Sequence, residues 1–127
     1  MGSQTVHAHG IDIVEIERIE EAIESWGDRF LRRVYTDAEI KYCRGNASEL
    51  AVRFAGKEAV MKALGTGARG VSCRDIEILN DQLGAPLVYL CGGAQSRAQE
   101  LGIESLAITL SHSREYAVAS VVGEKRA

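Results

Sequence analysis

The short connection between the last two apolar segments constrains the fold more than any other feature of this 127-residue chain. Residues 106–110 and 117–122 are both apolar and typical of strands, and only residues 111–115 separate them. A parallel crossover needs about a dozen residues or more, so these two strands have to pair antiparallel. The sequence therefore favours a mixed α+β domain with an antiparallel sheet.

The remaining elements follow from hydrophobic periodicity and from residues that begin or end helices. Apolar residues recur at helical spacing from Ile16 to Trp26, and Gly27 can end that helix. Residues 36–39 have the form of a capping box, and Ser48 is predicted to cap the longest helix. The predicted helices cover residues 16–26, 36–45, 48–64 and 93–101. The other predicted strands cover residues 6–13, 75–79 and 87–90.

Composition limits the class of protein. The chain has 15 Lys and Arg against 18 Asp and Glu, and this net charge of −3 argues against a general nucleic-acid binder. No apolar run approaches the roughly 20 residues that span a bilayer, so no membrane association is expected, and the N-terminus lacks a signal-peptide pattern. We expect residues 1–127 to form a single domain, with residues 1–5 disordered. Because Cys43, Cys73 and Cys91 are unclustered, we expect reduced thiols in a cytoplasmic protein.

Glu58 and Lys62 lie one turn apart on one face of the longest predicted helix. Their neighbours on that face are small or apolar, namely Ala51, Phe54 and Ala55. This pattern suggests a face that another group contacts; the alternative is an exposed ion pair that stabilises the helix by about 0.2–0.5 kcal/mol. The helix ends at residues 65–67, Gly-Thr-Gly, where a ligand could approach the backbone, although glycine is also a usual helix end.

Asp12 interrupts the first apolar segment just before the first predicted helix. Aspartate is depleted in strands, and a buried one needs a partner or a metal, although a helix cap is the other role open to it. Asp12 and Glu58 together are a pair of carboxylates that suits Mg²⁺. That ion takes one or two protein oxygens and fills its octahedron with water and substrate phosphate.

A histidine and three hydroxyl groups lie within residues 109–113, where a strand ends and a turn begins. Ser111 and His112 are adjacent, so they point in opposite directions in a strand, and the chain has no G-x-S-x-G segment. Both facts argue against a Ser-His-Asp hydrolase, and a turn with hydroxyl caps is the simpler interpretation. His7 and His9 have a metal-compatible spacing, but two ligands without a third do not define a site.

Taken in order, these segments resemble the bacterial holo-acyl-carrier-protein synthases, the small class of 4′-phosphopantetheinyl transferases. The resemblance rests on residues 10–19 (GIDIVEIERI), 53–63 (RFAGKEAVMKA), 65–67 (GTG), 84–86 (GAP), 111–112 (SH) and 116–121 (YAVASV). It implies the phosphopantetheinyl transferase fold, in which an antiparallel sheet packs against a long helix. Larger members carry two copies of that fold, and 127 residues leave room for only one.

The resemblance also implies roles for particular residues. Asp12 and Glu58 are expected to hold Mg²⁺, and Lys62 is expected to contact the pyrophosphate of coenzyme A. The expected coenzyme A cleft includes Arg53, Lys62, Gly65, Thr66, Gly67, Pro86, Ser111 and His112. Small members of the family are homotrimers with active sites between subunits, so a homotrimer is expected for this chain.

The implied reaction is attack of a serine hydroxyl of apo-acyl carrier protein on the β-phosphorus of coenzyme A. Phosphopantetheine is transferred and 3′,5′-ADP leaves. Phosphoryl transfer depends on positioning and charge neutralisation more than on a protein nucleophile, and Lys62 would stabilise charge on the leaving phosphate. Glu58, a water on the metal or His112 could take the serine proton, and Glu58 is favoured.

The chain departs from the family pattern in several places. Gly56 stands inside a helix where Ala or Ser is usual, at a cost of about 1 kcal/mol, and Ala85 stands where a basic residue is frequent. The first helix carries mostly glutamates, whereas the family has basic residues there that contact the acidic carrier protein. Arg29, Arg32 and Arg33 are therefore candidate docking charges, and an ordinary solvated surface is the alternative.

Two other functions fit parts of the pattern. A non-catalytic coenzyme A or nucleotide-binding module would keep Lys62 and the glycines but would not need both Asp12 and Glu58. A purely structural oligomerisation domain gives no reason for charged residues on the small-residue face of the longest helix. The pair of carboxylates favours the transferase.

Overall fold

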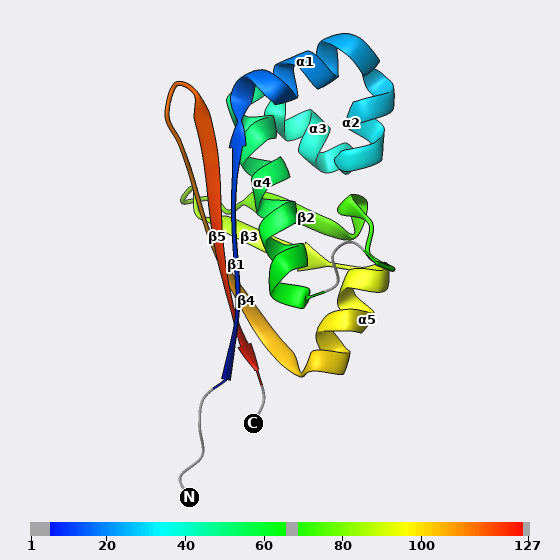
Figure 1. Cartoon of the computed structure of the whole chain (residues 1–127), viewed down its shortest axis with the longest axis vertical. Helices are drawn as coiled ribbons and strands as arrows, with labels where there is room; N and C mark the ends of the chain where they lie inside the picture. The colour runs from blue at the N-terminus through cyan, green and yellow to red at the C-terminus, as the bar shows by residue number, and fades with distance from the viewer. Residues whose placement is uncertain (1–5, 66–68, 126–127) are drawn as a thin grey trace, which may run out of the picture.

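The computed structural model describes residues 6–65 and 69–125 (Figure 1). Its helices are α1 (Ile16–Trp26), α2 (Asp28–Val34), α3 (Asp37–Cys43), α4 (Ala47–Leu64) and α5 (Gly92–Leu101), with a 3-10 helix at Cys73–Asp75. The strands are β1 (Val6–Glu15), β2 (Ile76–Asn80), β3 (Pro86–Leu90), β4 (Ile103–His112) and β5 (Tyr116–Lys125). None of the described helices combines the length and the apolar character needed to cross a membrane. The expected disorder of residues 1–5 concerns positions outside the described residues.

The main sheet is antiparallel, as the short connection between its last two strands predicted. Its strand order is β1-β5-β4, and β2 and β3 form a separate antiparallel hairpin. The sequence predicts Ser111 and His112 in the connecting segment, but the structure places both at the end of β4. The ladder continues to His112, which lies opposite Ala117 in the register.

The long helix α4 packs on one face of this sheet, against β1 and β5 (Figure 1). Side chains of β1 alternate, so that Ala8 and Gly10 face α4 while Ile11 and Ile13 face away and are exposed. Backbone meets backbone at Gly10, because a Cβ atom there would lie 1.8 Å from the carbonyl oxygen of Ala59. β1 and α4 are therefore held at a separation that only glycine permits.

The helices α1, α2 and α3 pack around the N-terminal half of α4 and form a second part of the core. Ile16 and Ile19 of α1 are buried there with Tyr35, whose hydroxyl donates a hydrogen bond of 2.7 Å to the carbonyl of Leu50. Val14 contacts both parts of the core. The end of β1 is thus fixed between the sheet and the small helices.

Helix starts show where local sequence was informative. The capping box at Thr36 is confirmed, since its hydroxyl accepts from the Glu39 amide and the Glu39 carboxylate accepts from the Thr36 amide. The prediction of Ser48 as the cap of α4 is wrong, because Asn46 caps that helix by accepting from the amide of Glu49 at 3.0 Å. Asn46 lies two residues earlier and is an equally good capping residue.

Among the described residues, three charged side chains are fully buried, and we call Glu39, Arg53 and Lys57 the buried charge cluster. They contact the edge of β2 that does not pair with β3. Lys57 Nζ donates to Glu39 Oε1 at 2.7 Å and to the carbonyl of Ile76. Glu39 Oε2 accepts from the Ile78 amide at 2.9 Å, and Arg53 Nε donates to the Ile78 carbonyl at 2.9 Å. Side chains thus satisfy the backbone groups that a neighbouring strand would otherwise satisfy.

Candidate active site

The charged residues of α4 fall on two different sides of the helix. Arg53 and Lys57, one turn apart, contact β2 as members of the buried charge cluster. Lys62 contacts β1, and Glu58, one turn before it, lines a cavity together with residues of β1. The segment that reads as one motif in the sequence therefore divides into a supporting side and a side that faces the candidate site.

Lys62 connects α4 directly to β1. Its Nζ donates to Asp12 Oδ1 at 3.0 Å and to the carbonyl of Ile11 at 2.9 Å. The Lys62 side chain is 56% exposed and that of Asp12 is 18% exposed. Exposed ion pairs contribute little to stability, so this pair is not needed to hold the fold together. The exposed Lys62 side chain is accessible to a ligand.

Asp12 and Glu58 line one cavity with a volume of about 410 Å³. The other lining residues are mostly apolar: Ile13, Val14, Ile19, Ala22, Phe30 and Phe54, together with Arg18. The two side chains that the sequence predicts as a carboxylate pair thus line the same cavity, between β1, α1, α2 and α4. A cleft with a few polar groups among apolar walls is the usual form of a small-molecule site.

The electrostatic surroundings of Glu58 are unusual. Burial raises the pKa of its carboxyl group, the nearby Asp12 carboxylate raises it further, and Lys62 lowers it. A bound cation stabilises the ionised form of a carboxylate that lies close to another carboxylate. In the described part of the chain, no group of three or more His, Cys, Asp or Glu side chains is placed to hold a metal. This pair therefore suits an ion that needs only one or two protein ligands, such as Mg²⁺.

The C-terminal end of α4 borders a second cavity, with a volume of about 550 Å³. The helix ends at Gly65, as predicted, in a left-handed conformation with φ 67°, and Arg97 of α5 donates to the carbonyl of Leu64 at 3.0 Å. Gly65 and Arg97 both line this cavity. Thr66 and Gly67, the other predicted parts of the coenzyme A cleft in this region, lie outside the described residues.

Arg53 is placed differently from an exposed ligand-binding arginine. It is fully buried, and besides Ile78 it donates to the backbone carbonyl and the carboxylate of Glu49 and to Asn80 Oδ1, at 3.2, 2.7 and 2.7 Å. The ring of Tyr42 lies 4.6 Å from its guanidinium carbon. Its contact with coenzyme A stays a prediction, and most of its donors are already used inside the chain.

Pro86, Ser111 and His112 lie away from the carboxylate pair within this chain. Pro86 begins β3, on the hairpin. Ser111 and His112 are exposed at the end of β4, and β5 separates β4 from β1. Two strand spacings correspond to about 10 Å. One chain therefore brings together Asp12, Glu58 and Lys62 but leaves these three residues on other parts of its surface.

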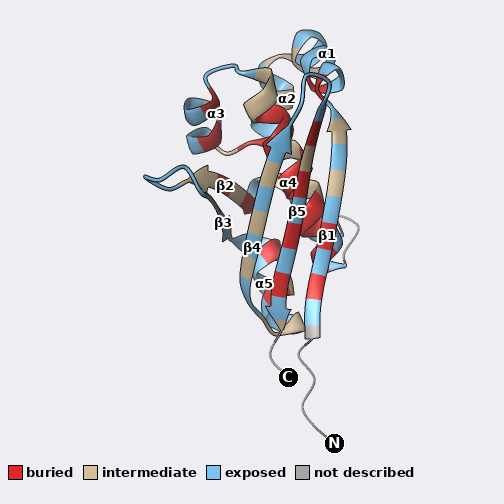
Figure 2. Ribbon diagram, turned by 90° about the vertical axis from the view of Figure 1, so that its left-hand side faces the viewer, coloured by how far each residue is buried: buried red, intermediate tan, exposed pale blue. Residues whose placement is uncertain are grey.

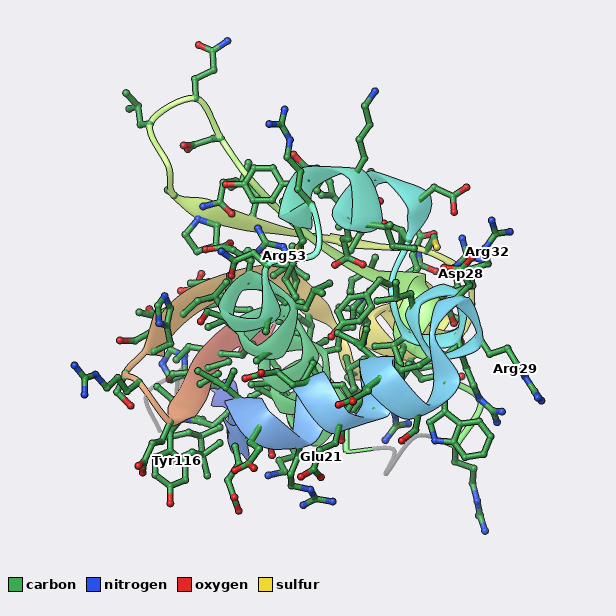
Figure 3. All side chains as sticks on the ribbon, turned by 90° about the horizontal axis from the view of Figure 1, so that it is seen from above. Glu21, Asp28, Arg29, Arg32, Arg53 and Tyr116 are labelled. Carbon is green, nitrogen blue, oxygen red and sulfur yellow. The ribbon has the colours of Figure 1, made fainter. Side chains whose placement is uncertain are left out.

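Helix α2 is absent from the helices predicted from the sequence, in which Arg29, Arg32 and Arg33 are only candidate docking charges. Phe30 of α2 lines the cavity, whereas Arg29, Arg32 and Arg33 are exposed. Figure 3 shows Arg29 and Arg32 projecting outward from α2, on the same side of the molecule as each other. The spacing of Phe30 and Val34, one turn apart, was the available signal for a helix.

Comparison with known proteins defines the class of enzyme. Residues 8–121 match the family model described as the 4′-phosphopantetheinyl transferase superfamily. The match includes Asp12, Glu58 and Lys62, so the residues gathered at the cleft lie inside the shared domain.

Relatives and solved structures narrow this class. The chain is 50% identical over 121 residues to a holo-[acyl-carrier-protein] synthase of Herpetosiphon aurantiacus, covering 90% of this chain and 95% of that protein. It is 45% identical over 119 residues to one from Halothermothrix orenii, covering 91% and 95%. The structure superimposes on the Helicobacter pylori synthase in complex with coenzyme A with a TM-score of 0.83 at 37% identity, covering 91% and 98%. The chain belongs to the 4′-phosphopantetheinyl transferase superfamily and, within it, to the holo-[acyl-carrier-protein] synthases, which are enzymes. The expected α+β fold is also confirmed.

Proposed function

We propose that this enzyme transfers 4′-phosphopantetheine from coenzyme A to a serine of an apo-acyl carrier protein, with Mg²⁺ as cofactor and 3′,5′-ADP as the second product. The observation that carries the proposal is the meeting of Asp12, Glu58 and Lys62 at the β1–α4 contact. The Helicobacter pylori relative was solved with coenzyme A and a Bacillus anthracis relative, 35% identical, with coenzyme A (3′,5′-ADP). Both support coenzyme A as the donor.

Asp12 and Glu58 would hold the Mg²⁺ ion. The fit rests on their shared cavity and on the raised pKa of Glu58, to which Asp12 contributes. When bound, Mg²⁺ supplies positive charge for the pyrophosphate oxygens of the donor. The two carboxylates are hard oxygen ligands, and they leave other coordination positions for water and phosphate.

Lys62 would stabilise the charge that develops on the leaving phosphate. Its exposed amine sits beside Asp12, so it can turn toward a phosphate without unfolding any part of the helix. Glu58 is the favoured acceptor of the serine proton, acting directly or through a water. Burial raises its pKa toward the range in which a carboxylate is an effective base.

A second copy of the chain would complete the site. Asp12, Glu58 and Lys62 lie together, whereas Pro86, Ser111 and His112 lie elsewhere on the chain. Figure 2 shows the face of the sheet opposite the helices, which no described element covers. Ile11 and Ile13 are each 63% exposed on this face, as Val122 is at 41%. We propose that these apolar residues bury one another in a homotrimer, with sites between subunits.

The carrier protein would dock near α2. Exposed Arg29, Arg32 and Arg33 supply positive charge next to the helix that contributes Phe30 to the cleft. The glutamates of α1, including Glu21 in Figure 3, disfavour an acidic partner at that helix. We further propose that the enzyme acts in the cytoplasm.

The test is the intact mass of an apo-acyl carrier protein after incubation with the enzyme, coenzyme A and Mg²⁺. The wild type should add the mass of one phosphopantetheine group, and EDTA should abolish the gain. Glu58→Gln should lose the activity while keeping its melting temperature. Coenzyme A binding without any mass gain would favour a non-catalytic binding module instead.

Light scattering after gel filtration tests the assembly. The wild type should have the mass of three chains, and Val122→Glu on the exposed sheet face should reduce it. A monomeric wild type that still transfers phosphopantetheine would contradict the need for a second copy.

A further inference from the structure

Arg53 is bound to the β2–β3 hairpin at the position where the hairpin carries Pro86. Its Nη2 donates to Asn80 Oδ1 at 2.7 Å, and its Nε donates to the carbonyl of Ile78 at 2.9 Å. Asn80 lies directly opposite Pro86 in the register of the hairpin. One side chain and one pair of opposed residues therefore connect Arg53 of α4 to Pro86.

This end of the hairpin is held by side chains and by the turn itself, where the Asp81 amide donates to the Ala85 carbonyl at 2.8 Å. Asn80 and Pro86 share no backbone hydrogen bond, because they are a non-hydrogen-bonded pair of the antiparallel register. The peptide groups of Ile78 are bound by Glu39 and Arg53, on the side away from β3, and alternation gives Asn80 the same orientation. The Asn80 side chain has two contacts, because its Oδ1 accepts from Arg53 and its Nδ2 donates to the carbonyl of Gly84 at 2.8 Å.

The third nitrogen of the guanidinium group is also occupied. Nη1 donates to the backbone carbonyl of Glu49 and to its carboxylate, the latter at 2.7 Å. The side chain has no exposed surface, and Tyr42 covers it. A phosphate could reach this group only if these internal contacts were broken.

We propose that Arg53 is a positioning residue, which holds Asn80 and thereby Pro86 in place and does not itself contact coenzyme A. This inference rests on the proposed function, in which Pro86 belongs to the coenzyme A cleft. Loss of the Arg53–Asn80 bond should weaken coenzyme A binding through movement of the hairpin. The effect should be the same whether or not the donor carries its 3′-phosphate.

The test uses the full chain and three variants: Arg53→Lys, Asn80→Ala and Asn80→Asp. Both Asn80 variants lose the donor to Gly84, but Asn80→Asp keeps an acceptor for Arg53, so their difference isolates the Arg53 contact. Arg74→Lys is the matched control, since Arg74 contacts the exposed Asp37 at 3.3 Å. For each protein, KM and kcat are measured with coenzyme A and with 3′-dephospho-coenzyme A, and amide hydrogen exchange is measured in β3.

Asn80→Ala should raise KM for both donors by the same factor, about 5–50-fold, as expected within one hydrogen-bond network. It should change kcat little and speed amide exchange in β3. Asn80→Asp and Arg74→Lys should stay close to wild type. Arg53→Lys should resemble Asn80→Ala, and the Arg53→Lys/Asn80→Ala double variant should be no worse than either single variant.

Two results would overturn the inference. One is a wild-type KM and wild-type β3 exchange in Asn80→Ala, which decides the matter even if Arg53→Lys fails to fold. The other is an Arg53→Lys protein whose KM rises for coenzyme A only, because that pattern shows direct contact with the 3′-phosphate. A wild type that neither binds coenzyme A nor modifies a carrier protein refutes the proposed function and this inference with it. If the wild type is active, either of the two results above refutes only the positioning role of Arg53.

Discussion

Replacing Gly10 with alanine tests whether the β1–α4 contact sets the position of the carboxylate pair. An added Cβ would lie 1.8 Å from the carbonyl oxygen of Ala59, 2.8 Å from its carbonyl carbon and 3.0 Å from the amide nitrogen of Ala63. All three are backbone atoms, so no side-chain rotation relieves the clash. The first distance has to increase to at least 3.0 Å, which requires β1 and α4 to separate by about 1 Å.

The expected cost has two parts. Overpacking of this kind reduces the free energy of unfolding by about 1–3 kcal/mol. For a domain of this size, the melting temperature should fall by about 4 °C for each kcal/mol. Asp12 lies two residues along β1 from Gly10, so it moves relative to Glu58 by a similar distance. A misplacement of about 1 Å can cost about 10²-fold in rate, and we expect that loss in phosphopantetheine transfer.

Gly123→Ala is the matched control. Gly123 lies on β5 opposite Ala8, and an added Cβ would meet side-chain methyl groups, Leu106 Cδ2 at 3.0 Å and Ile103 Cγ2 at 3.3 Å. These can shift, so we expect less than about 1 kcal/mol of destabilisation and wild-type transfer. Thermal melts and the carrier mass assay measure both variants. Full activity and full stability in Gly10→Ala would refute the reasoning.

Three further predictions concern stability and pH. Lys57→Met should lower the free energy of unfolding by about 3–5 kcal/mol, because it leaves the buried Glu39 carboxylate without its cation. Lys62→Met should lower it by less than about 1 kcal/mol but abolish phosphopantetheine transfer. Urea unfolding and the carrier mass assay, applied to both variants, distinguish the two lysines. Burial raises the pKa of the Cys43 thiol to about 11 from 9.0, so the unfolded chain loses this proton first and stability should fall as pH rises from 9 to 11. Melts across this range should show a smaller fall in Cys43→Ala, and an equal fall would contradict the assignment. Gly56→Ala should change the free energy of unfolding by less than about 1 kcal/mol, because the gain in helix propensity offsets the cost of moving Ile78. Ile78 Cδ1 would lie 2.5 Å from the added Cβ and has to shift. A loss of several kcal/mol in the same unfolding assay would show that Ile78 cannot move.

Local signals predicted those parts of the fold that short-range physics decides. The Thr36 capping box and the end of α4 at Gly65 each depend on a few neighbouring residues, and both are confirmed. The short β4–β5 connection allowed only antiparallel pairing. Asn46 and Ser48 are both good caps two residues apart, so local sequence could not choose between them.

The different roles of the α4 residues could not be derived from periodicity. α4 is buried on several sides, so its pattern does not separate the side that faces β1 from the side that faces β2. Lys57 and Lys62 look equivalent in the sequence, but the burial of Lys57 depends on Glu39 and on the edge of β2. Those partners are distant along the chain, and only the folded structure brings them together.

The candidate site was predictable to the extent that it lies on one strand and one helix. Asp12, Glu58 and Lys62 were named from the sequence. Asp12 and Glu58 line the cleft, and Lys62 donates a hydrogen bond to Asp12. Phe30 was missed because α2 is a short helix of 7 residues with three arginines, which conceal its apolar spacing.

Binding of Mn²⁺, a paramagnetic substitute for Mg²⁺, tests the central claim that Asp12 and Glu58 together hold a divalent cation. Titrations followed by electron paramagnetic resonance would compare the wild type with Asp12→Asn and Glu58→Gln, each with and without coenzyme A. We expect one Mn²⁺ per wild-type chain, bound more tightly with coenzyme A. Removal of an outer-shell partner of a metal ligand costs roughly 10–100-fold in metal affinity. Each variant removes a ligand itself, so its Mn²⁺ affinity should fall by at least that factor. Unchanged Mn²⁺ affinity in both folded variants would contradict the claim.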